Sequence, residues 1–313
     1  MQLNAKFIWL DGQYIPWQQA NTHVLSHHYG IGVFEGLRCY STPQGAAIFR
    51  LAAHTDRLFR SAHILNMKIP YDKQTLNQVQ CEIIAKNQLS NGYIRPFVFY
   101  GGEHLGLVTH PLSTHVMIAA VEWQGAYGGA EKLVDGIKVH TSSFSHNHVN
   151  SVFTKAKANG NYMNSILAMQ EALACGADEA LLLDQEGCVA EGSGAHIFLV
   201  RDGVLYTPEL TSIIEGITRD TVLVLAKDLG LTVVEKSITR DEIYIADEAF
   251  FTGTAVEITP IREIDHRIIA QGKRGPITKK LQEAYAKAVH GENSRYEEWL
   301  SLIPSALVSG IQE

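Results

Sequence analysis

The sequence carries the stretch TKAKANGNY at residues 154–162, which places Lys155 and Lys157 among small residues. The stretch lies between a predicted strand at 137–141 and a predicted helix at 162–175. A lysine that binds an aldehyde covalently must be partly buried, so that its amine is neutral near pH 7. Most lysines at the start of a helix are simply solvated. The stretch therefore has to be interpreted together with the rest of the chain.

The regions on either side predict two α/β domains. The first third predicts short strands closed by turns, with helices at 53–65 and 76–86. Beyond residue 130 strands and helices alternate, and the helix at 162–175 is expected to end at Gly176. The apolar side of that helix is expected to consist of Ile166, Leu167 and Met169.

Clustered glycines mark the predicted boundary between the domains. The stretch GAYGGA at 125–130 breaks both helix and strand. The prediction is a small N-terminal α/β domain at 1–124, a linker at 125–133 and a larger C-terminal domain at 134–313. The fold class is therefore α/β (α+β), with a site expected at the domain junction, where ligand pockets tend to lie.

Composition narrows the classes of partner. The chain has 313 residues, 46% of them hydrophobic, and a net charge of −7. No dense run of Lys and Arg suggests nucleic acid, and no apolar stretch is long enough to span a membrane. The four cysteines lie far apart and predict reduced thiols in a cytoplasmic protein. Histidine pairs such as His27-His28 have no acidic or cysteine partner at ligand spacing, so no metal site is expected.

Several further segments suit a phosphorylated cofactor. Glu191 precedes small residues and a strand, and it could hold the pyridine nitrogen of pyridoxal 5'-phosphate (PLP) protonated. The stretch Gly216-Ile217-Thr218 opens a predicted helix, whose free N–H groups attract anions. Thr254, in a strand-to-turn segment, and Arg57 could add further phosphate contacts. Taken singly, these features are equally compatible with turns, helix caps and solvated side chains.

Taken together, the segments resemble the class IV, fold-type IV PLP enzymes over most of the chain. The resemblance implies that Lys157 is the Schiff-base lysine, that Tyr162 contacts the phenolic oxygen of PLP and that Glu191 pairs with its pyridine nitrogen. Lys155 is the rival lysine, but Lys157 has the matching distance to Asn161-Tyr162. The resemblance assigns the phosphate to Arg57, Ile217, Thr218 and Thr254.

Within this class, the stretch YGIGVFEGLR at 29–38 looks like the branched-chain aminotransferase signature. The resemblance implies transamination of L-leucine, L-isoleucine and L-valine with 2-oxoglutarate, in a homodimer at least or in a hexamer. In this family the tyrosine at position 29 and the loop at 105–107 reach the neighbouring subunit's site. The residues that it assigns to the substrate are Tyr29, Phe34, Gly36, Arg38, Tyr93, Arg95, Leu105, Leu107, Trp123, Tyr127, Thr254 and Ala255.

Some positions depart from the family pattern. His146 stands where an arginine is expected, His196 where an asparagine is expected, and Val149 and Phe153 where prolines are expected. These departures concern the substrate pocket and the rate. The alternatives left open are an aminodeoxychorismate lyase, a D-amino-acid or amine transaminase, and a PLP-binding protein without catalytic activity.

Overall fold

A computed structural model describes residues 5–21, 30–102, 107–109, 112–123, 125, 127, 129 and 131–304. The chain divides into two compact units. Unit 1 comprises Met1–Trp123, Ala156–Gly160 and Lys287–Glu313, and unit 2 comprises Gln124–Lys155 and Asn161–Ala286. The predicted C-terminal domain at 134–313 is thus distributed over both units. The reason is backbone hydrogen bonding, because Phe34 N donates to Lys157 O at 3.0 Å and Ile303 N donates to Ala46 O at 2.8 Å.

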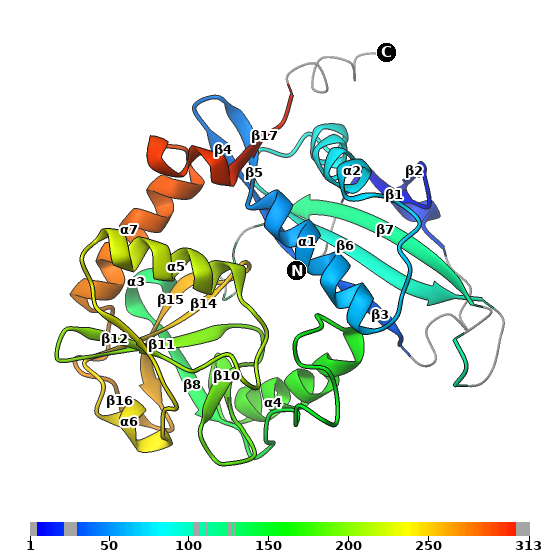
Figure 1. Ribbon diagram of the computed structural model, residues 1–313. Helices are drawn as coiled ribbons and strands as arrows, with labels where there is room; N and C mark the ends of the chain where they lie inside the picture. Colours follow the sequence, from blue (N-terminus) through cyan, green and yellow to red (C-terminus); the bar gives the residue numbers. More distant parts are fainter. Residues whose placement is uncertain are drawn as a thin grey trace. The chain divides into compact units, whose positions relative to one another are not determined.

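Unit 1 contains an antiparallel sheet with strand order β17-β5-β4-β6-β7-β1-β2, and β3 also pairs with β6 (Figure 1). Its strands are β1 (Phe7–Leu10), β2 (Gln13–Pro16), β3 (Gly32–Phe34), β4 (Leu37–Thr42), β5 (Gly45–Phe49), β6 (Gly92–Gly101), β7 (Ser113–Glu122) and β17 (Leu300–Leu302). Its helical segments are η1 (Trp17–Gln19), α1 (Leu51–Ile64), α2 (Lys73–Lys86) and η4 (Ser294–Trp299).

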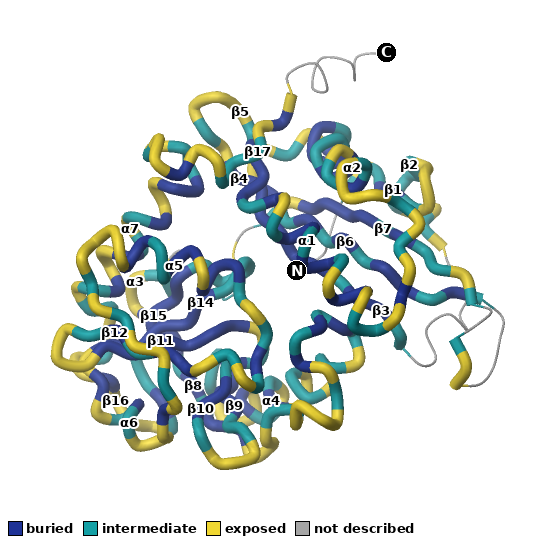
Figure 2. Tube along the Cα trace, in the orientation of Figure 1, coloured by how far each residue is buried: buried dark blue, intermediate teal, exposed yellow. Residues whose placement is uncertain are grey.

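The two faces of this sheet differ because successive strand residues point to opposite sides. Ile94 and Val98 of β6 are fully buried in the core that the sheet forms with α1 and α2, alongside Leu58 and Ile83 (Figure 2). Fully burying each such side chain stabilises the unit by about 1.5–3 kcal/mol. The alternate residues of β6, among them Arg95, consequently lie on the opposite face.

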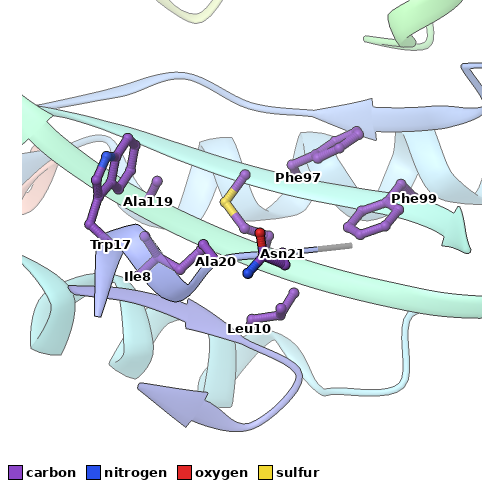
Figure 3. A pocket seen from close by; sticks show the side chains of 9 residues that line it. Ile8, Leu10, Trp17, Ala20, Asn21, Phe97, Phe99 and Ala119 are labelled. Carbon is purple, nitrogen blue, oxygen red and sulfur yellow. The ribbon is translucent and has the colours of Figure 1, made fainter. Parts of the chain in front are cut away.

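That opposite face also contains an apolar pocket of about 400 Å³ (Figure 3). Its lining comes from β1, η1, β6 and β7, and consists of Ile8, Leu10, Trp17, Ala20, Asn21, Phe97, Phe99, Met117 and Ala119. Phe97 is the cross-strand partner of Phe34 in the register of β3 and β6. The pocket therefore continues the sheet face that carries Phe34 and Arg95.

Unit 2 contains a mixed sheet with strand order β10-β9-β8-β15-β14-β11-β12-β13, and β16 pairs with β15. Its strands are β8 (Ile137–Thr141), β9 (Glu179–Leu183), β10 (Val189–Gly192), β11 (His196–Arg201), β12 (Val204–Thr207), β13 (Val233–Glu235), β14 (Glu248–Gly253), β15 (Glu257–Ile264) and β16 (Arg267–Ile268). Its helices are α3 (Lys132–Asp135), α4 (Tyr162–Ala174), α5 (Ile217–Asp228) and α6 (Arg240–Tyr244). Two helical segments, η3 (Asn159–Asn161) and α7 (Pro276–Val289), have residues in both units.

The helix predicted at 162–175 forms as α4, but its expected apolar side is wrong. Ala168 and Ala172 are its buried residues and pack with Ala180 and Leu182 of β9. Ile166 and Leu167, by contrast, are 50% and 38% exposed. Alanine lets a helix backbone lie close to a sheet, so here the smaller residues and not the larger ones face the core.

A largely buried carboxylate, that of Asp265 after β15, links its own segment to β8 and α6 in unit 2. Asp265 accepts hydrogen bonds from the backbone N–H and the hydroxyl of Thr141, from Arg240 Nη2 and from the Tyr244 hydroxyl, at 2.7, 2.7, 2.8 and 2.7 Å. Burial alone would raise the pKa of Asp265, but these donors outweigh it and lower the pKa to about 2. The charged form of Asp265 therefore stabilises the unit.

Among the described residues, no helix has both the length and the apolar character needed to cross a membrane.

Candidate active site

Lys157 is positioned by a short segment that lies beside β3. Phe34 N donates to Lys157 O at 3.0 Å, Lys157 N donates to Ser61 Oγ of α1 at 3.0 Å, and Ala158 forms an antiparallel bridge with Val33. Ala156 and Ala158 are buried in the core of unit 1. Because side chains alternate in extended chain, Lys157 lies on the opposite face. Its Nζ is 5.0 Å from the centroid of the Phe34 ring.

The same sheet face brings together four of the residues predicted to bind substrate. The Arg95 guanidinium lies 4.5 Å from the centroid of the Phe34 ring, and its Nη2 donates to the Tyr93 hydroxyl at 2.9 Å. The Tyr93 and Trp123 rings are 4.9 Å apart. Trp123 Nε1 is buried and has no hydrogen-bond partner among the described residues. A buried donor without an acceptor is costly, so this indole N–H is suited to binding a ligand.

Gly36 and Arg38 complete this face. A Cβ at Gly36 would overlap the Tyr93 hydroxyl, which explains why only glycine fits there. Arg38 is the cross-strand partner of Tyr93, and its guanidinium lies 4.7 Å from the centroid of the Tyr40 ring. The face thus combines aromatic rings with two guanidinium groups, an arrangement that suits a ligand with both an apolar part and a carboxylate.

A buried ionic cluster lies next to this face, and of its three residues only Arg57 was predicted as part of the site. Glu35 is fully buried and accepts from Arg57 Nε at 2.6 Å and from Arg57 Nη2 at 2.9 Å. His54 Nδ1 lies 2.7 Å from the second oxygen of Glu35. Burial would raise the pKa of Glu35, but the Arg57 guanidinium and His54 outweigh it and hold the pKa well below its ordinary value. Arg57, predicted to bind phosphate, is therefore oriented by Glu35.

Sequence inspection could have found part of this cluster. His54 and Arg57 are three residues apart and share one side of α1. Their partner comes from the turn after β3, and no sequence spacing indicates that contact. Ser61, which holds the Lys157 backbone, was also missed for this reason.

Unit 2 positions Glu191 on β10 between two histidines. His146 Nε2 lies 3.1 Å from Glu191 Oε1, and His196 Nδ1 lies 3.5 Å from Glu191 Oε2. The Glu191 side chain is 16% exposed. His146 and His196 are two of the four departures from the family pattern that were expected to concern the substrate pocket. The structure instead brings both to the carboxylate that is predicted to hold the cofactor.

The first turn of α5 lies close to this cluster. The N-cap residue Gly216 provides no side-chain acceptor for that turn. No described hydrogen bond uses the backbone N–H of Ile217 or Thr218. A Cβ at Gly216 would overlap the His196 ring, so this ring packs directly against the helix start. An α-helix start with unused N–H donors is suited to binding an anion such as phosphate.

Thr254 and Ala255 form the turn between β14 and β15. They follow Thr252, which is paired with His196 across the two strands. The Thr252 hydroxyl is buried and has no partner among the described residues. Strand pairing therefore brings this hydroxyl-rich turn to the part of unit 2 that also holds His196 and Gly216.

The remaining predicted residues are less closely grouped. Tyr162 is the first residue of α4 and is half-buried. The Tyr127 hydroxyl donates to Glu179 Oε2 at 2.8 Å within unit 2. Leu107 is 83% exposed. Tyr29 and Leu105 lie outside the described residues.

Lys155 differs from Lys157 in its surroundings. Its Nζ donates to the carbonyls of Leu210 and Ile213, the second at 2.9 Å, and both carbonyls precede α5. Burial lowers the pKa of Lys155, but its amine is engaged in holding this loop. Of the two lysines, Lys157 is the one on the aromatic face of unit 1, and its role as the cofactor-binding lysine stays a prediction.

The described residues fit PLP in chemical type. Unit 1 provides a primary amine for the aldehyde, and unit 2 provides a carboxylate for the pyridine nitrogen and an uncapped helix start for the phosphate. The buried indole N–H of Trp123 and hydroxyl of Thr252, both without partners among the described residues, are further donors that a bound ligand would satisfy.

Comparison with known proteins agrees with this chemistry. Residues 32–264 match the family described as amino-transferase class IV. A branched-chain-amino-acid aminotransferase of Pseudomonas aeruginosa is 59% identical over 298 residues, which cover 95% of this chain and 97% of that protein. One from Escherichia coli K12 is 42% identical, with 96% of this chain and 98% of that protein covered.

Solved structures agree as well. The T.th. branched-chain amino acid aminotransferase with pyridoxamine 5'-phosphate has a TM-score of 0.94 and 48% identity, and the match covers 97% of this chain and all of that chain. The same T.th. enzyme complexed with 4-methylvaleric acid has a TM-score of 0.92 and 46% identity, with the same coverage.

Proposed function

Because the chain belongs to the class IV aminotransferase family, we propose that it transfers amino groups between branched-chain L-amino acids and 2-oxoglutarate, with PLP as its cofactor. The products are branched 2-oxo acids and L-glutamate. The observation that carries the proposal is the position of Lys157 on the aromatic sheet face beside Phe34 and Arg95. The relatives reported above are all named as branched-chain enzymes, which favours this branch over the lyase and D-amino-acid alternatives.

PLP supplies an aldehyde that binds amines and a ring that withdraws electrons from the bonds of the bound substrate. Lys157 would hold the cofactor through its Nζ, and the same amine would serve as the general base for the α-proton of the donor amino acid. Glu191 would hold the pyridine nitrogen, and Tyr162 would contact the phenolic oxygen. The phosphate is held by the N–H groups of Ile217 and Thr218, by Thr254 and by Arg57.

The substrate side chain lies against Phe34, Gly36 and Trp123, since apolar burial favours leucine, isoleucine and valine. Arg95 and Tyr93 bind the second carboxylate of 2-oxoglutarate or glutamate through charge-assisted hydrogen bonds. Arg38 adds positive charge on the same face. By resemblance, the backbone amides of Thr254 and Ala255 bind the α-carboxylate, and Tyr127 adds to the pocket. Tyr29, Leu105 and Leu107 belong to the same proposal through a neighbouring subunit.

A homodimer or a hexamer of the chain is part of the proposal. Three apolar residues of α4, namely Met163, Ile166 and Leu173, are at least 50% exposed. An exposed apolar patch of this kind is typical of a surface that a partner covers. Light scattering of the purified protein distinguishes the two assemblies. A cytoplasmic location is also proposed, and the four free cysteines support it.

The decisive experiment compares Lys157→Ala with Lys155→Arg. Lys157→Ala removes the general base, so turnover of L-leucine with 2-oxoglutarate should fall by about 100- to 10,000-fold. The absorbance change on adding PLP to the cofactor-free protein should be lost as well. Lys155→Arg keeps a cation that can bind the two carbonyls, and it should retain turnover. Normal activity in Lys157→Ala would refute the assignment, and turnover of D-alanine in place of L-leucine would refute the branch.

A further inference from the structure

Each oxygen of the Glu191 carboxylate faces a different imidazole. His146 lies 3.1 Å from Oε1 and His196 lies 3.5 Å from Oε2. The His146 and His196 side chains are only 11% and 6% exposed. The carboxylate is thus confined between two rings and has little contact with water.

Both rings are held by the fold. His146 N donates to Leu183 O of β9 at 2.7 Å, and Gln185 Nε2 donates to His146 O at 3.0 Å. His196 lies within β11, and its ring packs against Gly216 at the start of α5. The His196 ring therefore lies between Glu191 and the proposed phosphate-binding turn, while His146 holds the other oxygen of the carboxylate at hydrogen-bond distance.

The charge on His146 depends on Glu191. Burial by itself lowers the pKa of His146, but the hydrogen bond with Glu191 and its negative charge outweigh burial and raise the pKa. Asp184 acts in the same direction from the turn after β9. Lys155 is the other cation near Glu191, and it also faces Glu215. His146 therefore keeps its proton to a higher pH than an isolated imidazole would, and the proton balances part of the charge on Glu191.

We propose that His146 and His196 are positioning residues for Glu191, and that the proton on His146 sets how strongly Glu191 binds the pyridine nitrogen of PLP. A carboxylate that shares a proton with an imidazolium is a weaker acceptor for a second donor. When His146 loses its proton, Glu191 becomes the stronger acceptor. The arginine expected here by resemblance would keep its charge at all relevant pH values, whereas histidine makes the strength of this contact depend on pH.

The part of the proposal that concerns PLP rests on the proposed function, but the His146–Glu191 pair does not. The pair is tested in the cofactor-free protein by following histidine ring signals in NMR during a pH titration, with His146 assigned from its loss in His146→Gln. In Glu191→Gln the His146 midpoint should move to lower pH, because the anionic partner is gone. An unchanged His146 midpoint would overturn the pair.

The control of the pyridine nitrogen is tested with ¹⁵N-labelled PLP bound to the full-length protein. In the unchanged protein the chemical shift of the pyridine ¹⁵N should change with pH, and the midpoint pH of this change should equal that of the His146 ring. His146→Arg should remove this transition and still bind PLP. His146→Gln, a neutral donor, should also remove it and should weaken PLP binding by no more than about 2- to 10-fold, the effect of one hydrogen bond. The same transition in His146→Arg would overturn the proposed control.

Failure of the proposed function and failure of the His146–Glu191 pair give different results. If the protein does not bind PLP through Lys157, the ¹⁵N experiment gives no bound signal and the proposed function fails, while the titration of His146 against Glu191→Gln still tests the pair. Equal PLP spectra in Glu191→Gln and the unchanged protein would instead refute the link between the pair and the cofactor.

Discussion

Substitution of Glu35 by glutamine should destabilise unit 1 strongly. Glu35 is fully buried and makes contacts of 2.6 and 2.9 Å with Arg57 and of 2.7 Å with His54. Glutamine keeps the shape but removes the charge, and its amide places a donor against donors on Arg57 or His54. Breaking a buried ion pair from one side costs about 3–5 kcal/mol, because the other charge stays buried without compensation. The Tm of unit 1 should fall by about 6–20 °C for a unit of this size.

The assay can be made specific for unit 1, because all the tryptophans of the chain lie within it. They are Trp9, Trp17, Trp123 and Trp299. Urea unfolding followed by tryptophan fluorescence therefore reports on this unit alone. Asp56→Asn is the matched control on the same helix, since its 2.8 Å pair with Lys73 is about half exposed on both sides. That control should cost at most about 1 kcal/mol. Equal midpoints for the two variants would refute the structural importance of Glu35.

The contact between Glu35 and His54 determines how the stability of unit 1 changes with pH. The pKa of Glu35 lies below its ordinary value of 4.5, so its contribution is complete above pH 4.5 and is lost as the pH falls further. The pKa of His54 is lowered mainly by burial, so stability also falls as the pH drops below the ordinary histidine value of 6.5. The difference in the free energy of unfolding between Glu35→Gln and the unchanged protein should therefore become smaller below pH 4.5. A constant difference down to pH 3 would contradict this reasoning.

Two further substitutions test packing and charge. Gly36→Ala should push the Tyr93 hydroxyl aside and lower the free energy of unfolding, measured in urea, by about 1–3 kcal/mol. It should also raise KM for 2-oxoglutarate. An unchanged KM would show that Tyr93 does not bind that substrate. Asp265→Asn should destabilise unit 2 by about 1–3 kcal/mol, because the amide accepts fewer of the four hydrogen bonds made to the carboxylate while Arg240 is 45% exposed and stays solvated. This cost should shrink as the pH falls from 3.8 towards about 2. Hydrogen exchange at the Thr141 amide, which donates to Asp265, measures this effect locally; unchanged protection there would contradict it.

The sequence offers candidate site residues more readily than it indicates the packing around them. Lys157, Glu191 and Gly216 could be proposed because each lies in a short local pattern with a chemical meaning. The contact of Glu35 with Arg57 and the contact of His146 with Glu191 join distant segments, so no periodicity reports them. The histidines at 146 and 196 were recognised only as departures from a pattern, and strand pairing was needed to show that they meet.

The helices and long strands were also predictable, since apolar residues recur in each with the period of a helix or a strand. The predicted strand at 137–141 corresponds to β8, and the predicted helix at 76–86 lies within α2. The error at α4 arose because the small residues Ala168 and Ala172 face the sheet, so the side with the large apolar residues is the exposed one. The glycine cluster predicted a boundary after residue 124, and the units divide between Trp123 and Gln124. The return of Ala156–Gly160 and Lys287–Glu313 to unit 1 could not be predicted from glycine content, because it depends on where Lys157 and β17 form hydrogen bonds.

The position of β17 has a consequence for the order in which the chain can fold. Leu300 pairs with Phe49, so one edge of the first sheet is supplied by residues that are synthesised after the whole of unit 2. Every segment of unit 2 has been synthesised by Ala286, whereas unit 1 has an unpaired edge at β5 until residues 300–302 arrive. Contacts of such long sequence separation form slowly, and open strand edges favour aggregation during that time. A nascent chain that ends at Ala286 lacks β17, so its unpaired strand edge would be β5, which is close to the N-terminus in the sequence.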